Sequence, residues 1–457
     1  MIKTSFLYKL IQSRPTLKKV LESIGWSFLD NLFRKVIGFF IGAWVARYLG
    51  PSQFGLWNYA LALTSLFGVL ASLGAGSIAV RELVRSPEKR DELIGTTFVL
   101  YLLGSLISFS LILIYSLYIA KVDSFVFILI LINSVSFFFY PFAAVSVYYH
   151  AQLLLKYTIW AYNIAFIIVV IIKILLIWHE ASLTYFVITG PAEAILGICL
   201  LTWFYVRNVG SLRSWRFSYT LAKALIRSGF PLALSSVALM IYARIDQVMI
   251  REMLGDLSLG LYSVAVKISE VWYFVPGAIA SAAFPAVLRS KELGEEVYLA
   301  RLSKYFALMA WIGLSVGFFF ALSGSYIVNL LFGSRYEGSV GALRVLVWSG
   351  IGVCLRAAGD SWFISEGLER SILCREILGA GLNVLLNLLW IPAYGINGAA
   401  LATLVSYSFV GILYDYLDKK TRKLFFMKLR AFPYGVHLLR EYGMKLLRGG
   451  GENGLDL

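Results

Sequence analysis

The sequence predicts an all-α integral membrane protein with twelve transmembrane helices in two six-helix lobes. Hydrophobic residues make up 59% of the 457 residues and charged residues only 15%. Apolar segments of about 20 residues, each long enough to cross a bilayer core of about 30 Å, recur along the whole chain. An internal repeat also indicates that one half of the protein is built like the other.

The repeat pairs two stretches that read YLGPSQFGLWNYALAL (48–63) and MLGDLSLGLYSVAVKI (253–268). Gly50 and Gly55 of the first copy recur as Gly255 and Gly260 of the second. The glycines flank a short polar tip, which fits a tight turn because glycine accepts backbone angles that other residues resist. Each copy follows one apolar run and opens another, and chance similarity between apolar stretches is the alternative. We interpret the two copies as equivalent turns of two related halves.

Taken in order, the apolar runs predict helices at 22–47, 55–79, 94–120, 125–149, 157–178, 183–206, 226–250, 260–288, 300–323, 339–363, 371–392 and 396–417. Most Lys and Arg residues lie in the two tails and in the even-numbered connections between predicted helices. The odd-numbered connections carry only Arg47, Lys121, Arg251 and Arg335. This asymmetry predicts a cell-membrane protein with both termini, and the net charge of +15, in the cytoplasm. The repeat copies follow helices that run in the same direction, so the lobes are predicted to be parallel repeats around a central cleft.

The predicted organisation has five parts: a cytoplasmic N-terminal tail (1–21), a first lobe (22–207), a cytoplasmic linker (208–222), a second lobe (223–418) and a basic cytoplasmic tail (419–457). The N-terminal tail lacks the small-residue cleavage site of a removable signal peptide. The basic tail alternates basic and apolar residues. We interpret it as a helix lying on the anionic inner leaflet, or alternatively as a simple orientation signal.

Five segments carry a family resemblance: ARYLGPSQFGLWNYA, LGAGSIAVREL, DQVMIREMLGDLSLGLYSVA, LFGSRYEGS and IPAYGINGAALATLVS. In their order and spacing they resemble the polysaccharide-export flippases of the multidrug/oligosaccharidyl-lipid/polysaccharide exporter superfamily. The resemblance implies two six-helix bundles forming a V. It also implies transfer of lipid-linked, undecaprenyl-pyrophosphate-type oligosaccharides from the inner to the outer leaflet by alternating access without ATP. The chain agrees on the last point, because it has no Walker-type phosphate loop.

The first predicted helix carries a polar stripe with charges inside the membrane span. At about 100° per residue, one arc of about 140° contains the polar and small residues of this helix. They are Ser23, Ser27, Asp30, Asn31, Arg34, Lys35, Gly38 and Gly42. Asp30 and Arg34 are spaced to pair, which leaves Lys35 as an uncompensated cation. Ionisable residues in a span usually face a cavity or a partner, so this stripe predicts a polar cleft; snorkelling to the inner headgroups is the alternative.

The second lobe places its charges nearer the predicted outer side. Arg244 and Asp246 lie about 160° apart, so both cannot face the cleft, and comparison with the first helix favours Asp246. Lys267 and Glu270 share one helix face, where an intrahelical ion pair is the alternative to a site. We predict that Arg34 and Lys35 receive the phosphates of the substrate, and that Lys267 and Arg244 hold them in the outward-open state.

Four carboxylates are candidates for binding a coupling proton or Na⁺: Asp30, Glu193, Asp246 and Glu270. Glu193 is the most isolated of them, because Gly190 and Pro191 are expected to break the helix just before it, and broken helices form ion sites in transporters. A simple kink, with Glu193 bonded to a neighbour, is the alternative. No cofactor other than the coupling ion is expected.

Three classes of function stay open from the sequence. The leading one is the lipid-linked oligosaccharide flippase, which would work beside a polysaccharide polymerase and glycosyltransferases. A cation-coupled small-molecule exporter shares the predicted architecture but favours acidic and aromatic cavity residues, and peptidoglycan-precursor flippases usually carry two further helices. A membrane glycosyltransferase or polymerase needs a large external loop, and the longest here, 323–339, is short. Nucleic acid is not an expected partner.

Overall fold

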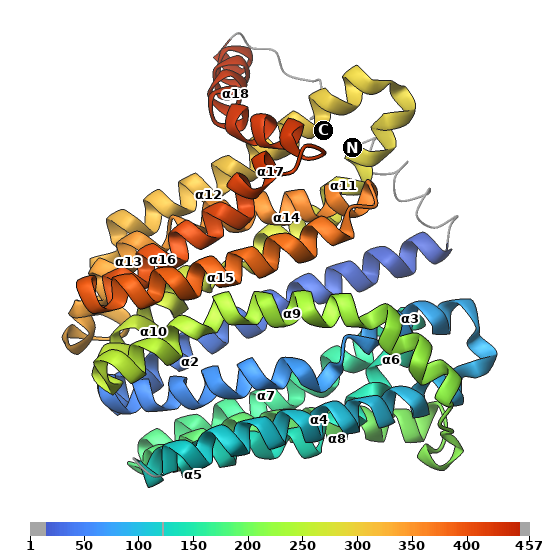
Figure 1. The fold of residues 1–457 in the computed structure, drawn as a ribbon, viewed down its shortest axis with the longest axis vertical. Helices are drawn as coiled ribbons and strands as arrows, with labels where there is room; N and C mark the ends of the chain where they lie inside the picture. Colours follow the sequence, from blue (N-terminus) through green and yellow to red (C-terminus); the bar gives the residue numbers. More distant parts are fainter. Residues whose placement is uncertain (1–14, 121–122, 448–457) are drawn as a thin grey trace. The chain divides into compact units, whose positions relative to one another are not determined.

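The computed structural model describes residues 15–120 and 123–447, and within them all regular structure is helical. With the labels of Figure 1, the helices of the first half are α2 (Pro15–Gly68), α3 (Ala75–Arg85), α4 (Arg90–Ala120), α5 (Ser124–Ser134), α6 (Val145–Ala151), α7 (Leu155–Trp178) and α8 (Leu183–Asn208). Those of the second half are α9 (Tyr219–Leu254), α10 (Asp256–Glu270), α11 (Phe274–Arg289), α12 (Glu295–Leu331), α13 (Val340–Leu346), α14 (Ser349–Ser365), α15 (Glu369–Tyr394), α16 (Ile396–Ser408), α17 (Tyr414–Leu417) and α18 (Arg422–Leu447). The predicted all-α membrane class is therefore confirmed.

The number of membrane spans depends on how bent helices are counted. In the described part of the chain, nine helices are long and apolar enough to cross a membrane, or eleven if each of two bent pairs is one span. The longest candidate, Leu29–Arg85, has 57 residues. At about 1.5 Å per residue it far exceeds a bilayer core of about 30 Å. Dividing it at the kink at Gly50 brings the count to the predicted twelve.

The kink at Gly50 and the break at Gly255 have the same backbone geometry. Gly50 has φ 76° and ψ 169°, and Gly255 has φ 85° and ψ 178°. Glycine alone adopts this region without strain, which explains why it stands at both positions. The following residues suit a helix start: Pro51 has no N–H to leave unsatisfied, and the Asp256 carboxylate complements the helix N-terminus. The repeat found in the sequence is thus a repeated turn in the structure.

The chain divides into two compact units. Unit 1 comprises residues 1–49 and 56–240, and unit 2 comprises residues 50–55 and 241–457. The boundary lies inside α9, between Met240 and Ile241, rather than in the linker 208–222. Close packing explains this position, because a Cβ added at Gly229 of α9 would lie 2.8 Å from the Gly74 carbonyl oxygen. The first half of α9 is therefore part of unit 1. The bounds predicted for the two lobes, and the cleft between them, stay predictions.

The two copies of the repeated turn pack against each other within unit 2. A Cβ at Gly260 would lie 1.8 Å from the Pro51 carbonyl oxygen, and one at Gly55 would lie 2.0 Å from the Asp256 carbonyl oxygen. Both contacts are equivalent under the repeat, because Pro51 and Asp256 occupy the same position in the two copies. Each copy therefore presents the same surface to the other copy, as two partners do across a two-fold axis. Glycine is required at both positions because any side chain would collide with backbone.

Equivalent helices also pair in the same way inside each unit. In unit 1, α7 packs against α8, as α15 packs against α16 in unit 2. In unit 1, α4 contacts α5, and in unit 2, α12 contacts α13 and α14. These matched neighbours support the prediction that the halves are parallel repeats.

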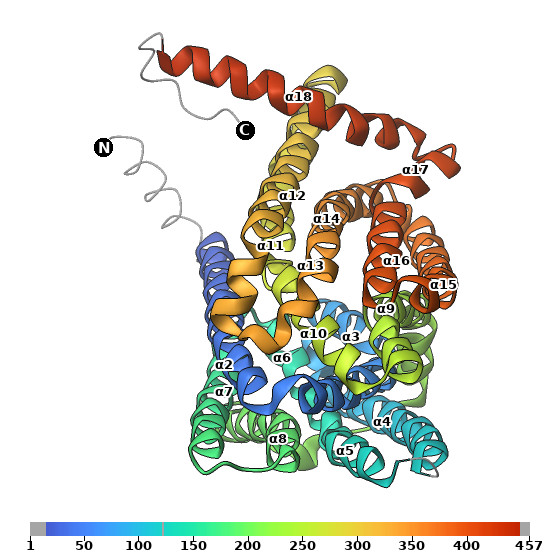
Figure 2. The same cartoon turned by 90° about the vertical axis from the view of Figure 1, so that its left-hand side faces the viewer.

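The C-terminal helix α18 belongs to the hydrophobic core of unit 2. Figures 1 and 2 show it crossing α12 rather than running beside it. Leu424 and Ala431 of α18 are buried in the same cluster as Phe306 and Met309 of α12. Part of the predicted basic tail is therefore a docked helix.

Candidate functional site

Arg34 of α2 forms an ion pair with Glu193 of α8 in unit 1. The guanidinium Nη2 donates to Glu193 Oε1 at 2.7 Å, and Nη1 donates to the backbone carbonyl of Tyr162 at 2.9 Å. The guanidinium also lies 5.0 Å from the centre of the Phe166 ring, a cation–π distance. The two side chains are 29% and 21% exposed. Arg34 is thus held on three sides, and part of each side chain of the pair stays exposed.

This pair corrects two predictions. Arg34 was predicted to pair with Asp30 on its own helix, but its carboxylate partner is Glu193, 159 residues away. Glu193 was predicted to be isolated after a break in its helix. Instead α8 continues through Pro191 from Leu183 to Asn208, so no broken-helix ion site forms there. The alternative reading, in which Glu193 bonds a neighbour, is confirmed.

The other predicted residues of α2 lie around this pair. Lys35 and Asn31 are exposed, and Asp30 is partly buried. Asp30 Oδ1 is a buried oxygen without a hydrogen bond among the described residues. The site of the first half thus combines two cations and two carboxylates within six positions of α2 and one position of α8.

In unit 2, Arg244 of α9 pairs with Glu270 of α10. Its Nη1 and Nη2 donate to the two carboxylate oxygens at 3.2 Å and 3.0 Å, the bidentate geometry for which the planar guanidinium is suited. An ion pair between Glu270 and Lys267 on one helix was the alternative to a site; in the structure Glu270 accepts both of these hydrogen bonds from Arg244. The Lys267 ammonium lies 5.6 Å from the centre of the Phe54 ring.

Asp246 is enclosed inside unit 2, with only 2% of its surface exposed. Tyr262 and Thr403 donate hydroxyl hydrogen bonds to its Oδ2 at 2.5 Å and 3.2 Å. Its Oδ1 accepts from the backbone N–H of Gln247 at 2.7 Å. Tyr262 occupies the place of Trp57 in the first copy of the repeat. Two hydroxyl groups and one backbone N–H therefore hydrogen-bond to this carboxylate.

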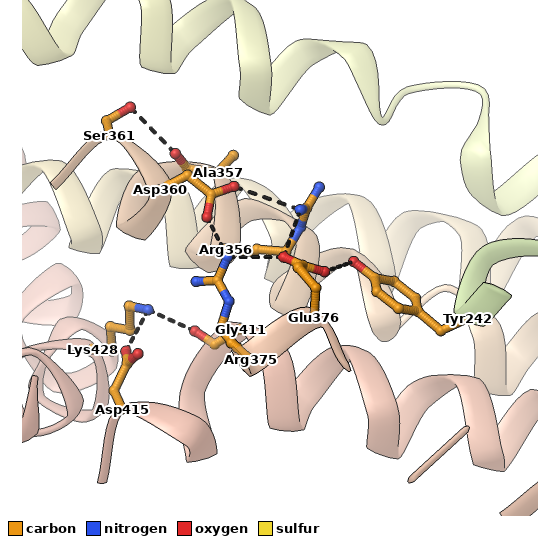
Figure 3. A network of polar contacts seen from close by, with 10 residues as sticks. All are labelled: Tyr242, Arg356, Ala357, Asp360, Ser361, Arg375, Glu376, Gly411, Asp415 and Lys428. Carbon is orange, nitrogen blue, oxygen red and sulfur yellow. Dashed lines mark hydrogen bonds and ion pairs between the residues drawn. The ribbon is translucent and has the colours of Figure 1, made fainter. Parts of the chain in front are cut away.

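A buried network that the sequence did not predict joins α9, α14 and α15 (Figure 3). Glu376 accepts from Arg375 at 3.0 Å, from Arg356 at 3.2 Å and from the Tyr242 hydroxyl at 2.7 Å. Arg375 also pairs with Asp360, and Arg356 lies 3.5 Å from the same carboxylate. Arg375 and Glu376 are 0% and 3% exposed. Two cations and two carboxylates thus balance each other, with Arg375 and Glu376 buried and Arg356 and Asp360 22% and 27% exposed.

Arg356 and Asp360 have the i, i+4 spacing of an ion pair on one helix, but Arg375 and Glu376 were not identified from the sequence. Both lie near the start of a predicted span, where charges usually reach the headgroups. The available signal was the adjacent Arg-Glu dipeptide inside an apolar run, opposite a helix that also carries an Arg and an Asp.

A second buried pair lies beside this network and involves α18 (Figure 3). Lys428 Nζ is 2.6 Å from Asp415 Oδ2, and neither side chain is exposed. The same ammonium donates to the Gly411 carbonyl at 2.8 Å. Gly411 lies in a π-helical turn, Phe409–Leu413, and such turns free backbone carbonyls for other donors. Burial lowers the pKa of the Lys428 amine, and the Asp415 carboxylate opposes that change.

Comparison with known proteins shows which family the chain belongs to. The family model described as "Polysaccharide biosynthesis protein" matches residues 20–291, which is more than half of the chain. The chain belongs to this family. The chain is 25% identical over 235 residues to the putative O-antigen transporter of Shigella flexneri, and this alignment covers 50% of this chain and 55% of that protein.

Other curated relatives are less informative. An uncharacterized membrane protein of Methanocaldococcus jannaschii is 26% identical over 198 residues, covering 42% of this chain and 38% of that protein. The chain thus spans about 38% to 55% of the length of the curated relatives it matches.

Solved structures share the fold of this chain. The lipid II flippase MurJ in an inward closed conformation has a TM-score of 0.68 at 17% identity, with 94% of each chain covered. An inward-facing multidrug resistance MATE family transporter of the MOP superfamily has a TM-score of 0.63 at 15% identity, covering 92% of this chain and 96% of that one. At these identities the likeness establishes the fold, whereas the family is shown by the match to the family model.

Proposed function

We propose that this protein is a flippase that moves a lipid-linked oligosaccharide across the membrane by alternating access. The observation that supports it best is the Arg34 site, which puts cations inside a membrane-spanning segment. Arg34 is held by Glu193 but keeps 29% of its side chain exposed, and Lys35 beside it is exposed. A phosphate-linked sugar needs such cations, because charge-assisted hydrogen bonds hold phosphate strongly where water is scarce.

The pairing of Arg34 with Glu193 supplies a way to couple the substrate to an ion. A phosphate that binds Arg34 competes with the Glu193 carboxylate for the same guanidinium. Glu193 released from Arg34 is an unpaired carboxylate in a low-dielectric region, and it then favours binding a proton or Na⁺. Substrate and coupling ion are thus linked through one arginine, and each raises the affinity of the site for the other.

The charged residues of unit 2 take the later roles in this proposal. Lys267 and Arg244 hold the phosphates in the outward-open state, and Glu270 exchanges with them as Glu193 does in unit 1. Asp246, surrounded by hydroxyl and amide groups, is the second candidate ion site. The sugars pass through water while the lipid tail stays in the bilayer.

The test is complementation of a flippase-deficient strain by the double variant Arg34→Ala, Lys35→Ala. Losing a charge-assisted contact costs about 1.5–3 kcal/mol, so glycan export should fall by roughly 100-fold or more at unchanged membrane abundance. Arg34→Lys should keep partial activity, because the charge remains and the bidentate fork is lost. Arg85→Ala, on an exposed side chain, is the matched control. Normal export by the double variant would exclude the site, and a transporter of cationic drugs would keep or gain activity.

A further inference from the structure

We propose that the C-terminal helix α18 carries a stripe that binds an anionic lipid surface beside unit 2. This inference concerns attachment to the membrane and is independent of the proposed transport function. It commits to one partner, the anionic headgroups of the leaflet that borders this end of unit 2.

One face of α18 is fully used by unit 2. At about 100° per residue, Leu424, Lys428, Ala431 and Gly435 fall within an arc of about 60°, and all four are buried. A Cβ at Gly435 would lie 1.9 Å from the indole nitrogen of Trp311. Lys428, the only basic residue of this arc, pairs with Asp415. The inward face therefore fixes both the position of the helix and its rotation about its own axis.

The opposite face is exposed and has a mixed character. The outward stripe, as we call it, is centred about 180° from the inward arc. Its exposed members are Arg422, Phe426, Leu429, Arg430, Pro433, Val436 and His437. Phe426, Pro433 and Arg422 lie at its middle, Leu429 and Val436 lie toward one flank, and Arg430 and Lys423 lie on the other. Apolar residues with basic residues at their side are typical of helices that lie in a membrane interface.

The charge of this segment favours an anionic surface. Between Asp418 and Glu441 the sequence has no acidic residue, but it has Lys419, Lys420, Arg422, Lys423, Lys428, Arg430 and Arg440. Lys428 is withdrawn into unit 2 and Lys423 pairs with Glu295 at 3.3 Å, so the other five supply the attraction. Each Lys or Arg near an anionic membrane adds measurably to binding, and the effect is confined to within about a Debye length, roughly 8–10 Å, of the surface.

Two observations place α18 at the level of the membrane interface. The helix begins at Arg422, directly after the candidate span Ile396–Leu417 ends. Trp311 of α12 donates to the Phe432 carbonyl at 3.1 Å. Residues 305–331 of α12 contain no charged residue, whereas Arg301 and Lys304 precede them. Since α18 crosses α12 (Figure 2) where charged residues give way to apolar ones, it lies at the edge of the hydrocarbon core.

The experiment places a spin label on the full-length protein in vesicles. Val436→Cys is made with Cys199→Ser and Cys374→Ser, which removes the two exposed cysteines. The label's collisions with oxygen, which prefers lipid, are compared with its collisions with a water-soluble nickel complex. Glu296→Cys in the same background is the control, because Glu296 lies in the charged start of α12 and is exposed. Vesicles contain phosphatidylcholine alone or with phosphatidylglycerol.

We expect the label at position 436 to be lipid-exposed in vesicles with phosphatidylglycerol and less so in phosphatidylcholine alone. Adding Arg422→Gln and Arg430→Gln should lower its partition into the anionic membrane by about 30-fold. The label at position 296 should face water throughout. A label at 436 that is as accessible to nickel as at 296 would overturn the proposal and indicate a water-facing or protein-binding surface. Equal lipid exposure in both vesicles would overturn the anionic specificity.

Discussion

Two ion-pair sites, Arg34–Glu193 in unit 1 and Arg375–Glu376 in unit 2, differ in how exposed their side chains are. In unit 1, Arg34 and Glu193 form a pair whose side chains are 29% and 21% exposed. In unit 2, Arg375 and Glu376 are 0% and 3% exposed, and Arg356 also donates to Glu376. An accessible pair can exchange its partner for a ligand at little cost, whereas breaking a buried pair leaves an uncompensated charge. The first arrangement suits binding and the second suits holding helices together.

The largest expected effect tests the buried side of this comparison. Glu376→Ala leaves Asp360 as the one carboxylate shared by Arg375 and Arg356 in this network, and the uncompensated buried charge should destabilise the folded protein by about 3–5 kcal/mol. The measurement is the thermal unfolding midpoint in detergent, with Glu369→Ala at the exposed start of the same helix as the control. An unchanged midpoint would show that the network contributes nothing to holding α14 and α15 together.

A second prediction tests the scaffold common to both copies of the repeat. Gly55→Ala and Gly260→Ala each force a Cβ against a backbone carbonyl. Each substitution should therefore lower the free energy of unfolding by about 1–3 kcal/mol, and the two losses should be similar. Gly381→Ala, with nothing within 4 Å of its added Cβ, is the matched control and should have little effect or stabilise its helix slightly. Unequal costs at positions 55 and 260 would contradict the symmetric contact.

A third prediction concerns the enclosed carboxylate of unit 2. Tyr262→Phe removes the hydroxyl that donates to Asp246 at 2.5 Å, which should cost about 1–3 kcal/mol because Asp246 stays buried with one donor fewer. Thermal unfolding with and without Na⁺ separates two roles. If Asp246 binds the coupling ion, the variant should also lose any stabilisation by Na⁺, since an ion that binds only the native state raises its stability.

The smallest effect on stability belongs to the accessible pair. Glu193→Gln keeps the shape of the side chain and removes its charge, and an ion pair open to water contributes only about 0–1 kcal/mol. Transport should nevertheless lose its dependence on the ion gradient, because the group that binds the ion is gone. The assay is export by vesicles with and without an imposed proton or Na⁺ gradient. A loss of several kcal/mol, or transport still driven by the gradient, would place Glu193 with the buried class.

The sequence by itself determined the membrane class, the succession of spans and the repeated turn. These depend on local properties. The length of an apolar run determines whether it can span the membrane, and a glycine with a positive φ interrupts a helix. Gly50 and Gly255 could therefore be recognised as equivalent before any contact was known. The spacing of Arg356 and Asp360 was readable for the same reason, because residues four apart on a helix are neighbours.

Only the tertiary structure decided which charges meet. Spacing allowed Asp30 to pair with Arg34 and Lys267 to pair with Glu270, but in the structure Arg34 pairs with Glu193 and Glu270 pairs with Arg244. Helical periodicity states which face a residue occupies, but it does not state which helix lies opposite or at what height. That depends on packing, set here by close backbone contacts such as Gly260 on Pro51. For the same reason a basic tail could be read in the sequence, but the withdrawal of Lys428 into unit 2 could not.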